Sequence, residues 1–521
     1  MFKKLLQKNN LILAIAIAWQ FISVGLISTN VWPDSVALIN LALLSALFVI
    51  LPKLDAVGLF LLSLPFMIVL PIGELPMWRP LVAWLFLVVC AKYLLQNLGG
   101  IKELTLKSLK MFAPWDKWLF GLLIIGVLSL LAARFKIHGA KQIIFLFNIY
   151  LLYVTCLIAA AGKEFLSSLL YYVKFSLLIT VILGFVQYGA SLLATPYYFW
   201  QYWATLVSSS YYGDSLGEVL SYSNSWFSAN GGGQSLRMFG ILQDTHAFSV
   251  IVIFALALWI ARFAGRSLKS LPWYFWVGLV GLCFAVIASG TRGAWLAMLA
   301  PVAVGLFLLA RHRARSLLLL PFVSYGIVVV LFVLSPLISS GLNLIRTINT
   351  DDNFLDRATS IYDLNESSNV GRLEIWKSSI NYAFTHPLGT GYGNFISSIT
   401  HSNSSNFEEV AGEKNLRYNL PQKFITAHSL YLHLLVELGV AGLILFGIVW
   451  LSFFKNIWLK LKSYQFEFNA HTALLLNIGL AMVWLLAYGF FDVTILNERV
   501  LLYLMALAAI VNLSLKKGQE N

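Results

Sequence analysis

Long apolar runs recur along the whole chain and limit the folds that it can adopt. Each run is close to the twenty or so residues that an α-helix needs to cross the hydrocarbon core of a bilayer. Of the 521 residues, 59% are hydrophobic and only 11% are charged. A soluble protein of this length would not need so much apolar surface. The sequence therefore predicts an all-α, polytopic integral membrane protein.

The length of the runs gives about fourteen spans, and we expect 12 to 14 transmembrane helices. The runs from 272 to 310 are divided at the turn Gly290–Gly293, because a single span there would be far too long. The expected spans are 11–29, 35–51, 56–71, 78–96, 116–133, 141–161, 169–192, 245–264, 272–290, 293–310, 316–338, 428–453, 470–490 and 497–515.

Lysine and arginine are distributed unevenly over the loops, which predicts the orientation of the spans. Cytoplasmic loops are enriched in these residues. With the N-terminus in the cytoplasm, alternate loops collect most of them: Lys102, Lys107, Lys110 and Lys117; Arg262, Arg266 and Lys269; Arg311, Arg313 and Arg315; Lys455, Lys460 and Lys462; Lys516 and Lys517. Both termini are then cytoplasmic, and the two long loops face outward.

This topology predicts five regions along the chain. They are N-terminal spans (1–192), an outer loop rich in aromatic residues and glycine (193–244), further spans (245–338), a large outer loop (339–427) and C-terminal spans (428–521). The aromatic cluster of the first loop is most simply an interfacial belt, and stacking against sugar rings is the alternative.

The net charge of +13 is explained by these basic loops, so nucleic acid is not an expected partner. The three cysteines, Cys90, Cys156 and Cys283, lie inside separate apolar runs without metal-ligand or redox spacing. No carboxylate cluster, metal-binding motif or phosphate-binding loop is visible near the outer loops. We therefore expect no metal and no cofactor.

The large loop holds one segment with helical periodicity, from Val370 to Phe384, with Ser368 or Asn369 as its N-cap. Its apolar stripe, which consists of Leu373, Trp376, Ile380 and Phe384, predicts a face that packs against the rest of the protein. That packing would fix Arg372 at the start of the helix.

Four basic residues are placed on the outer side by the topology: Arg237, Arg292, Arg372 and His428. An arginine at the membrane boundary is most often a snorkelling or structural residue. Three of them together suggest a site for a multivalent anion, since the guanidinium fork matches phosphate oxygens and stays charged.

His428 is a candidate general base. We expect it in the first turn of a span, where the positive end of the helix dipole disfavours imidazolium. The alternative is an interfacial histidine bonded to a loop carbonyl. His433 and Glu437 on the same span should face other directions.

At these residues the sequence resembles the bacterial O-antigen ligase and O-antigen polymerase superfamily. The resemblance covers roughly 235–450, and the order and spacing of its motifs are more specific than any one of them. The motifs are Ser289–Leu296, Gly371–Trp376, His386–Gly393, Ala427–Leu432 with Glu437–Gly442 and, more faintly, Arg237–Asp244. Ser429 departs from the asparagine that often follows the family's histidine, and about fourteen spans exceed the usual twelve.

The resemblance implies a multi-pass, inverting glycosyltransferase of the bacterial inner membrane with its active site on the periplasmic side. Its donor would be a glycan on undecaprenyl diphosphate, and its acceptor a lipid or another glycan. In this family the arginines that match Arg292 and Arg372 hold the diphosphate, and the histidine that matches His428 activates the acceptor hydroxyl. Arg237 would join the diphosphate site. No metal is implied.

Ligation to an acceptor is our first interpretation, and polymerisation by the same chemistry is the alternative. A polysaccharide flippase or other transporter is a rival of another class. It is disfavoured because the two halves show no repeat and no charged, broken helices at the midplane. In a structural or sensing membrane protein, the outward arginines would be incidental.

Overall fold

The computed structural model describes eight stretches of the chain, and α-helices make up most of the longer ones. Within these stretches, strands form only two short antiparallel hairpins, so the predicted all-α class is confirmed. The described residues are 8–96, 112–160, 165–214, 226–230, 233–312, 315–346, 367–395 and 426–516.

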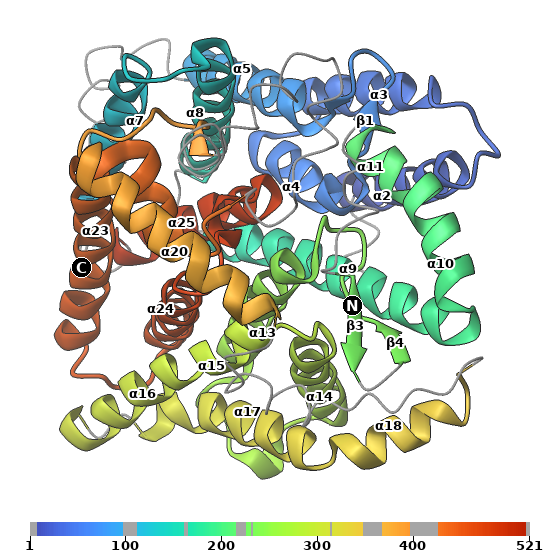
Figure 1. The fold of residues 1–521 in the computed structure, drawn as a ribbon, viewed down its shortest axis with the longest axis vertical. Helices are drawn as coiled ribbons and strands as arrows, with labels where there is room; N and C mark the ends of the chain where they lie inside the picture. The colour runs from blue at the N-terminus through green and yellow to red at the C-terminus, as the bar shows by residue number, and fades with distance from the viewer. Residues whose placement is uncertain are drawn as a thin grey trace.

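The elements of the first half of the chain are α2 (Lys8–Ser28), α3 (Val36–Ile50), α4 (Lys53–Ser63), η1 (Leu64–Phe66), β1 (Val69–Leu70), β2 (Leu75–Pro76), α5 (Trp78–Gln96), α7 (Asp116–Ser129), α8 (Lys136–Ala159), α9 (Phe165–Leu193), α10 (Pro196–Tyr202), η2 (Trp203–Ser208), α11 (Ser209–Tyr212), β3 (Phe227–Asn230) and β4 (Gly233–Leu236). In Figure 1 the helices from α2 to α8 lie together across the upper part of the view, and α10 lies to their lower right.

The second half supplies the remaining spans and one helix that lies outside them. Its elements are α13 (Thr245–Phe263), η3 (Leu268–Ser270), α14 (Trp273–Ala288), α15 (Arg292–Ala297), α16 (Leu299–His312), α17 (Arg315–Val333), α18 (Ser335–Asn343), α20 (Ser367–Thr385), α23 (Leu430–Ser463), α24 (Ala470–Tyr488), η6 (Thr494–Leu496) and α25 (Glu498–Lys516).

Three helices, α13, α24 and α25, form the centre of the bundle. In the apolar windows of these helices 78%, 72% and 67% of the residues are buried, against 33–44% in the other candidate spans. A helix that is apolar on every side is expected to be enclosed by other helices. The outer helices instead leave large apolar side chains exposed, including Ile15 of α2 and Leu87 of α5, as a lipid environment permits.

The number of spans agrees with the prediction. Among the described residues ten helices are long and apolar enough to cross a membrane, and α3 and α14 are shorter apolar helices, which gives twelve. Several expected spans are not continuous helices, and two of them change course. In 56–71 the chain leaves α4 through η1 into the β1–β2 hairpin, and 316–338 is divided between α17 and α18, where Pro336 occupies the first turn of α18.

If the spans alternate in direction as predicted, the outer turns must meet at one end of the bundle and the inner turns at the other, and the contacts agree with this. At one end Thr291 Oγ1 donates to Thr245 O at 3.2 Å, and Leu430 N donates to Gly489 O at 2.7 Å. At the other end His312 stacks on Phe466, with the ring centroids 4.1 Å apart. The outer turns of the predicted topology thus share one end of the bundle.

Helix α23 is broken near its start, at Gly439, where φ is 69° and ψ is −172°. The break separates a short segment, 430–438, from a long one, 440–463, and frees backbone groups that a bilayer cannot satisfy. The turn 387–391 satisfies them. Thr390 N donates to Val436 O at 2.9 Å, Gly391 N donates to Glu437 O at 3.0 Å, and Val440 N donates to Pro387 O at 3.0 Å. Two distant motifs of the sequence therefore form one interlocked unit.

This interlock explains glycines on both sides of the contact. A Cβ atom on Gly389 would lie 2.5 Å from Glu437 O, and one on Gly439 would lie 2.4 Å from Pro387 O. Both glycines also have positive φ, which side chains strongly disfavour. The two backbones can thus approach this closely only because glycine occupies both positions.

Helix α20 spans Ser367–Thr385, so Arg372 lies in its second turn rather than at the predicted helix start. The predicted packing stripe is also wrong. Ile375, Ser379 and Ala383 are buried, whereas Phe384, with Leu373 and Ile380, is exposed. Small residues at this face let α20 approach segment 430–438 closely, and hydrophobicity alone does not report that. Trp376 borders the contact and donates from Nε1 to Ala427 O at 3.0 Å.

We predict that Gly439→Ala lowers the free energy of unfolding by about 1–3 kcal/mol or more, because the new side chain meets both a disfavoured backbone geometry and the Pro387 carbonyl. Thermal unfolding of the protein in detergent measures the effect. Gly447→Ala on the same helix is the matched control, since a Cβ there contacts nothing within 4 Å. Equal melting temperatures for the two variants would contradict the interlock.

Candidate functional site

The Asp492 carboxylate lies between two histidines at the end of the bundle where the predicted outer turns meet. Its Oδ2 is 3.6 Å from Nδ1 of His246 and 3.7 Å from Nδ1 of His428. Thr494 Oγ1 donates to its Oδ1 at 2.5 Å. His246 Nδ1 is also 2.5 Å from the Tyr488 hydroxyl. Residues from three separate parts of the chain thereby form one polar cluster.

His428 reaches this cluster through an unusual backbone conformation. Its φ is 45°, in the left-handed region, and it precedes Ser429, the N-cap of α23. The expectation that it lies in the first turn of a span is therefore wrong. Ala427 is fully buried beneath α20, so the chain must turn sharply between that anchor and the helix. Histidine is among the residues that tolerate such a turn.

Arg237 is held beside this cluster by its main chain. Arg237 N donates to Trp226 O at 2.9 Å, and Gln187 Nε2 donates to Arg237 O at 3.2 Å. Its side chain runs over Gly290, where a Cβ would lie 2.9 Å from Arg237 Cδ. A larger residue at position 290 would therefore collide with the Arg237 side chain. This contact brings Arg237 to the turn that contains Arg292.

Arg292 begins α15, in the tight turn that the sequence predicted between two spans. Its neighbour Gly293 packs on the turn after α24, with a Cβ position 2.7 Å from Phe491 Cβ and 3.1 Å from Tyr488 Cε2. On the other side Thr291 is bonded to Thr245. The backbone of Arg292 therefore lies between the segment that carries His246 and the segment that carries Asp492.

Arg372 approaches from above the bundle ends, where α20 crosses in front of α24 and α25 in Figure 1. The packing of Ile375 against Ala427 and Val436 holds this helix in place. Arg372 lies one turn before Ile375 on this helix, and Ala427 is the residue before His428. The structure thus brings together the neighbourhoods of all four residues predicted from the sequence.

The two acidic residues of the cluster have opposite shifts in pKa. Burial raises the pKa of Asp492, but His246, His428 and the Thr494 hydroxyl outweigh burial and leave the pKa below its ordinary range. Burial, followed by the charge of Asp492, raises the pKa of Asp244 to about 6. Asp492 is therefore the permanent negative charge of the cluster.

His246, Tyr488 and Asp492 were missed in the sequence, although the topology contains a signal for two of them. His246 follows the outer loop 193–244, and Asp492 lies in the short turn between the last two expected spans. Both turns were predicted on the side of His428. A search for ionisable residues at the outer ends of spans and in short outer turns would have found them.

His433 and Glu437 form a separate group, away from Asp492. His433 Nε2 lies 3.5 Å from Glu437 Oε1, which accepts a hydrogen bond from Phe395 N at 3.1 Å. Phe395 also stacks on the His433 ring. Glu437 thus anchors the end of the 387–395 turn, as expected of a packing residue.

Among the described residues no group of three or more His, Cys, Asp or Glu side chains is arranged to hold a metal ion. The ligand that the cluster fits best is an anion with several oxygens. The guanidinium groups of the arginines are donors that match such oxygens.

Comparison with known families places this site in context. Residues 277–447 match the family model described as O-antigen ligase, which confirms the predicted family resemblance. The matched segment contains Arg292, Arg372 and His428, whereas Arg237, His246 and Asp492 lie outside it. No curated protein shows significant sequence similarity to the chain.

We predict that Asp244 makes stability depend on pH. Its pKa is raised in the folded protein, so its contribution is complete below about pH 4 and is lost as pH rises through about 6. Asp244→Asn keeps an N-cap for α13 but removes the charge. Between about pH 4 and about pH 7 the wild type should therefore lose on the order of 2 kcal/mol relative to this variant. Melting curves of both proteins at the two pH values measure the difference, and parallel curves would exclude this role.

Proposed function

Because residues 277–447 match the O-antigen ligase family, we propose that this protein transfers a glycan from undecaprenyl diphosphate to an acceptor hydroxyl. The reaction takes place at the outer face of the bacterial cytoplasmic membrane, inverts the anomeric carbon and needs no metal ion. The observation that carries the proposal is the Asp492 carboxylate, 3.7 Å from His428 Nδ1, in the cluster that Arg237, Arg292 and Arg372 approach.

The arginines supply the site for the donor's diphosphate. A diphosphate exposes several oxygens, and guanidinium groups from different segments can bind them at once. Their charge also stabilises the negative charge that develops on the leaving diphosphate as the sugar–oxygen bond breaks. This role is what we propose for Arg237, Arg292 and Arg372.

His428 acts as the general base. Its Nδ1 faces Asp492, which favours the tautomer with the proton on Nδ1 and leaves Nε2 free to accept one. The acceptor hydroxyl gives its proton to Nε2 as its oxygen attacks the anomeric carbon from the side opposite the diphosphate. The bond between that carbon and the diphosphate oxygen breaks, so one inversion occurs. Asp492 then stabilises the imidazolium, as the carboxylate of a catalytic triad does.

A second lipid-linked glycan in the acceptor position would make the same chemistry a polymerisation. The experiment that tests the proposal is reconstitution of the purified protein with undecaprenyl-diphosphate glycan and an acceptor. Release of undecaprenyl diphosphate with a single transferred glycan indicates ligation, and a ladder of products indicates polymerisation. Movement of the donor across the bilayer without release would favour a flippase instead.

We predict that His428→Ala and His428→Gln both lose most transfer activity, by about a hundredfold to ten-thousandfold, because neither can take the proton. Donor binding should remain, since the diphosphate is bound by the arginines. Asp492→Asn should also lower kcat, with little change in the KM for the donor. The control is His386→Gln, the same change at an exposed histidine. A well-expressed His428→Gln protein with near-normal turnover would falsify the role of His428.

We also predict a large loss of activity for Arg372→Lys, which keeps the charge but lacks the bidentate fork. Arg292→Ala should behave similarly. If both bind one diphosphate, the double variant should lose less than the product of the two single losses. Lys377→Ala is the control for charge loss on α20, because this side chain is exposed. Losses that multiply fully would indicate two separate anions.

A further inference from the structure

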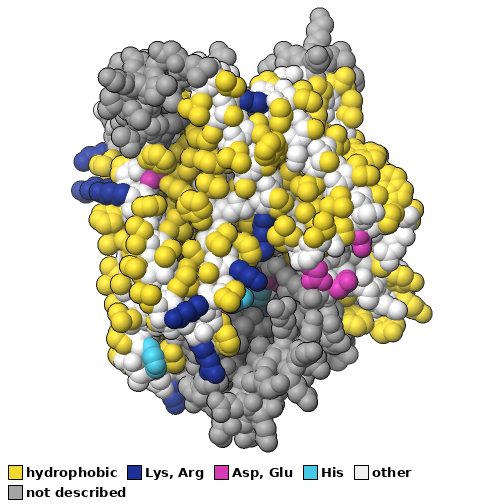
Figure 2. Space-filling view, turned by 90° about the horizontal axis from the view of Figure 1, so that it is seen from above, with side chains coloured by type: hydrophobic (Ala, Val, Ile, Leu, Met, Phe, Trp, Pro, Cys, Tyr) yellow, Lys and Arg dark blue, Asp and Glu magenta, His cyan; other side chains and the backbone are white. Residues whose placement is uncertain are grey.

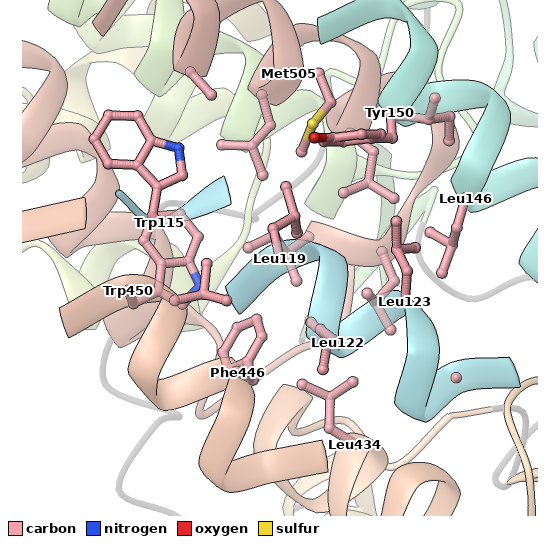
Figure 3. Close-up of a pocket in the computed structure, with 18 of the residues that line it drawn as sticks. Trp115, Leu119, Leu122, Leu123, Leu146, Tyr150, Leu434, Phe446, Trp450 and Met505 are labelled. Atoms are coloured by element: carbon pink, nitrogen blue, oxygen red, sulfur yellow. The ribbon is translucent and has the colours of Figure 1, made fainter. Parts of the chain in front are cut away.

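An apolar cavity of about 160 Å³ lies between α7, α8, α23 and α25, below the candidate site. Figure 3 shows Leu119 and Leu122 of α7 on one side of it and Met505 beside the Tyr150 ring on another. Its lining extends along α7 from Trp115 to Gly126, which corresponds to about 16 Å of helix. The cavity therefore follows α7 over much of its length.

The outer end of this cavity adjoins the residues proposed for catalysis. Ile495 and Leu496 line it, and they follow Asp492 in the same turn. Leu434 and Leu438 also line it, and they belong to the short segment 430–438 that begins just after His428. A ligand whose polar end reaches the arginines and His428 would thus direct its apolar part into this space.

The side of the molecule where α5, α7 and α8 lie is mostly apolar. Figure 2 shows this side, with a small group of Lys and Arg side chains beside a hollow toward the lower edge of the view. Among the exposed residues there are Val127 and Leu128 of α7 and Ile144 and Phe147 of α8. These side chains offer a hydrocarbon chain of the bilayer an apolar surface along both helices.

We propose that this cavity binds the part of the donor's polyprenyl chain nearest to the diphosphate. The inference rests on the proposed function and adds where the lipid is held. Apolar cavities of about 150 Å³ accept molecules the size of benzene, so this one holds a segment of the chain, and the rest lies among membrane lipids. A chain that enters from lipid gains little from the hydrophobic effect. The segment therefore orients the donor, so that its anomeric carbon faces His428.

Two substitutions fill the cavity from opposite walls, Gly126→Leu on α7 and Met505→Trp on α25. Gly126 has room for a side chain, because a Cβ there would lie 3.9 Å from the nearest atom, Ile143 Cγ1. Gly326→Leu is the matched control. It is the same change in α17, which does not line the cavity, and a Cβ there meets nothing within 4 Å.

The first test needs no transfer reaction. The probe is undecaprenyl diphosphate with a photoreactive diazirine in the isoprene units nearest to the diphosphate, added to the protein in phosphatidylcholine vesicles. We expect labelled peptides from 115–126 and 501–508, with labelling reduced about tenfold in both filled variants and unchanged in Gly326→Leu. Labelling elsewhere, or equal labelling by a diazirine-bearing phosphatidylcholine, would overturn the proposal.

The second test compares a donor that carries the polyprenyl chain with a donor that carries only a methyl group on the diphosphate. In Gly126→Leu the KM for the polyprenyl donor should rise about tenfold, while the KM for the methyl donor and the kcat for both should change little. Equal effects on both donors would overturn the cavity assignment but leave the proposed function intact. Specific labelling of the cavity in a protein that transfers no glycan would support the cavity assignment but overturn the proposed function.

Discussion

The backbone hydrogen bonds that cross the break in α23 are the contact on which the rest of this structure depends. Inside a bilayer a helix can stop only where another part of the protein satisfies its free carbonyl and amide groups. The turn 387–391 does this at Gly439 with three hydrogen bonds. The break lets segment 430–438 take a direction of its own, and α20 packs on that segment. Without it, His428 and Arg372 would have no common support.

The polar cluster obeys the same constraint at the ends of the spans. Charged groups are costly in a bilayer, so they gather where helices end and where partners are close. Asp492 illustrates this, because two histidines and a threonine hydroxyl compensate for its burial. His246 lies at the start of α13, His428 lies just before α23, and Thr494 lies in the same short turn as Asp492. The cluster therefore exists only when α13, α23, α24 and α25 are assembled, which links the folding of the core to the assembly of the site.

The sequence was informative where hydrophobic length or residue type decides the outcome. It predicted most spans and the four basic residues that the structure gathers at one end. It did not predict the true packing face of α20, because small residues such as Ser379 and Ala383 make that contact and carry no apolar signal. It placed His428 inside a helix because nothing in a single sequence reports the left-handed conformation of a non-glycine residue. Asp492 escaped notice because its partners are close only in three dimensions.

The small core beneath α20 has a consequence for how the length of this chain can vary. Phe395 and Ala427, which lie on either side of residues 396–426 in the sequence, both belong to that core. The entropic cost of closing a loop rises only slowly with its length. Insertions or replacements between these two anchors would therefore leave His428 and Arg372 where they are. The fold thus allows the length of the chain between these anchors to change without moving the residues of the polar cluster.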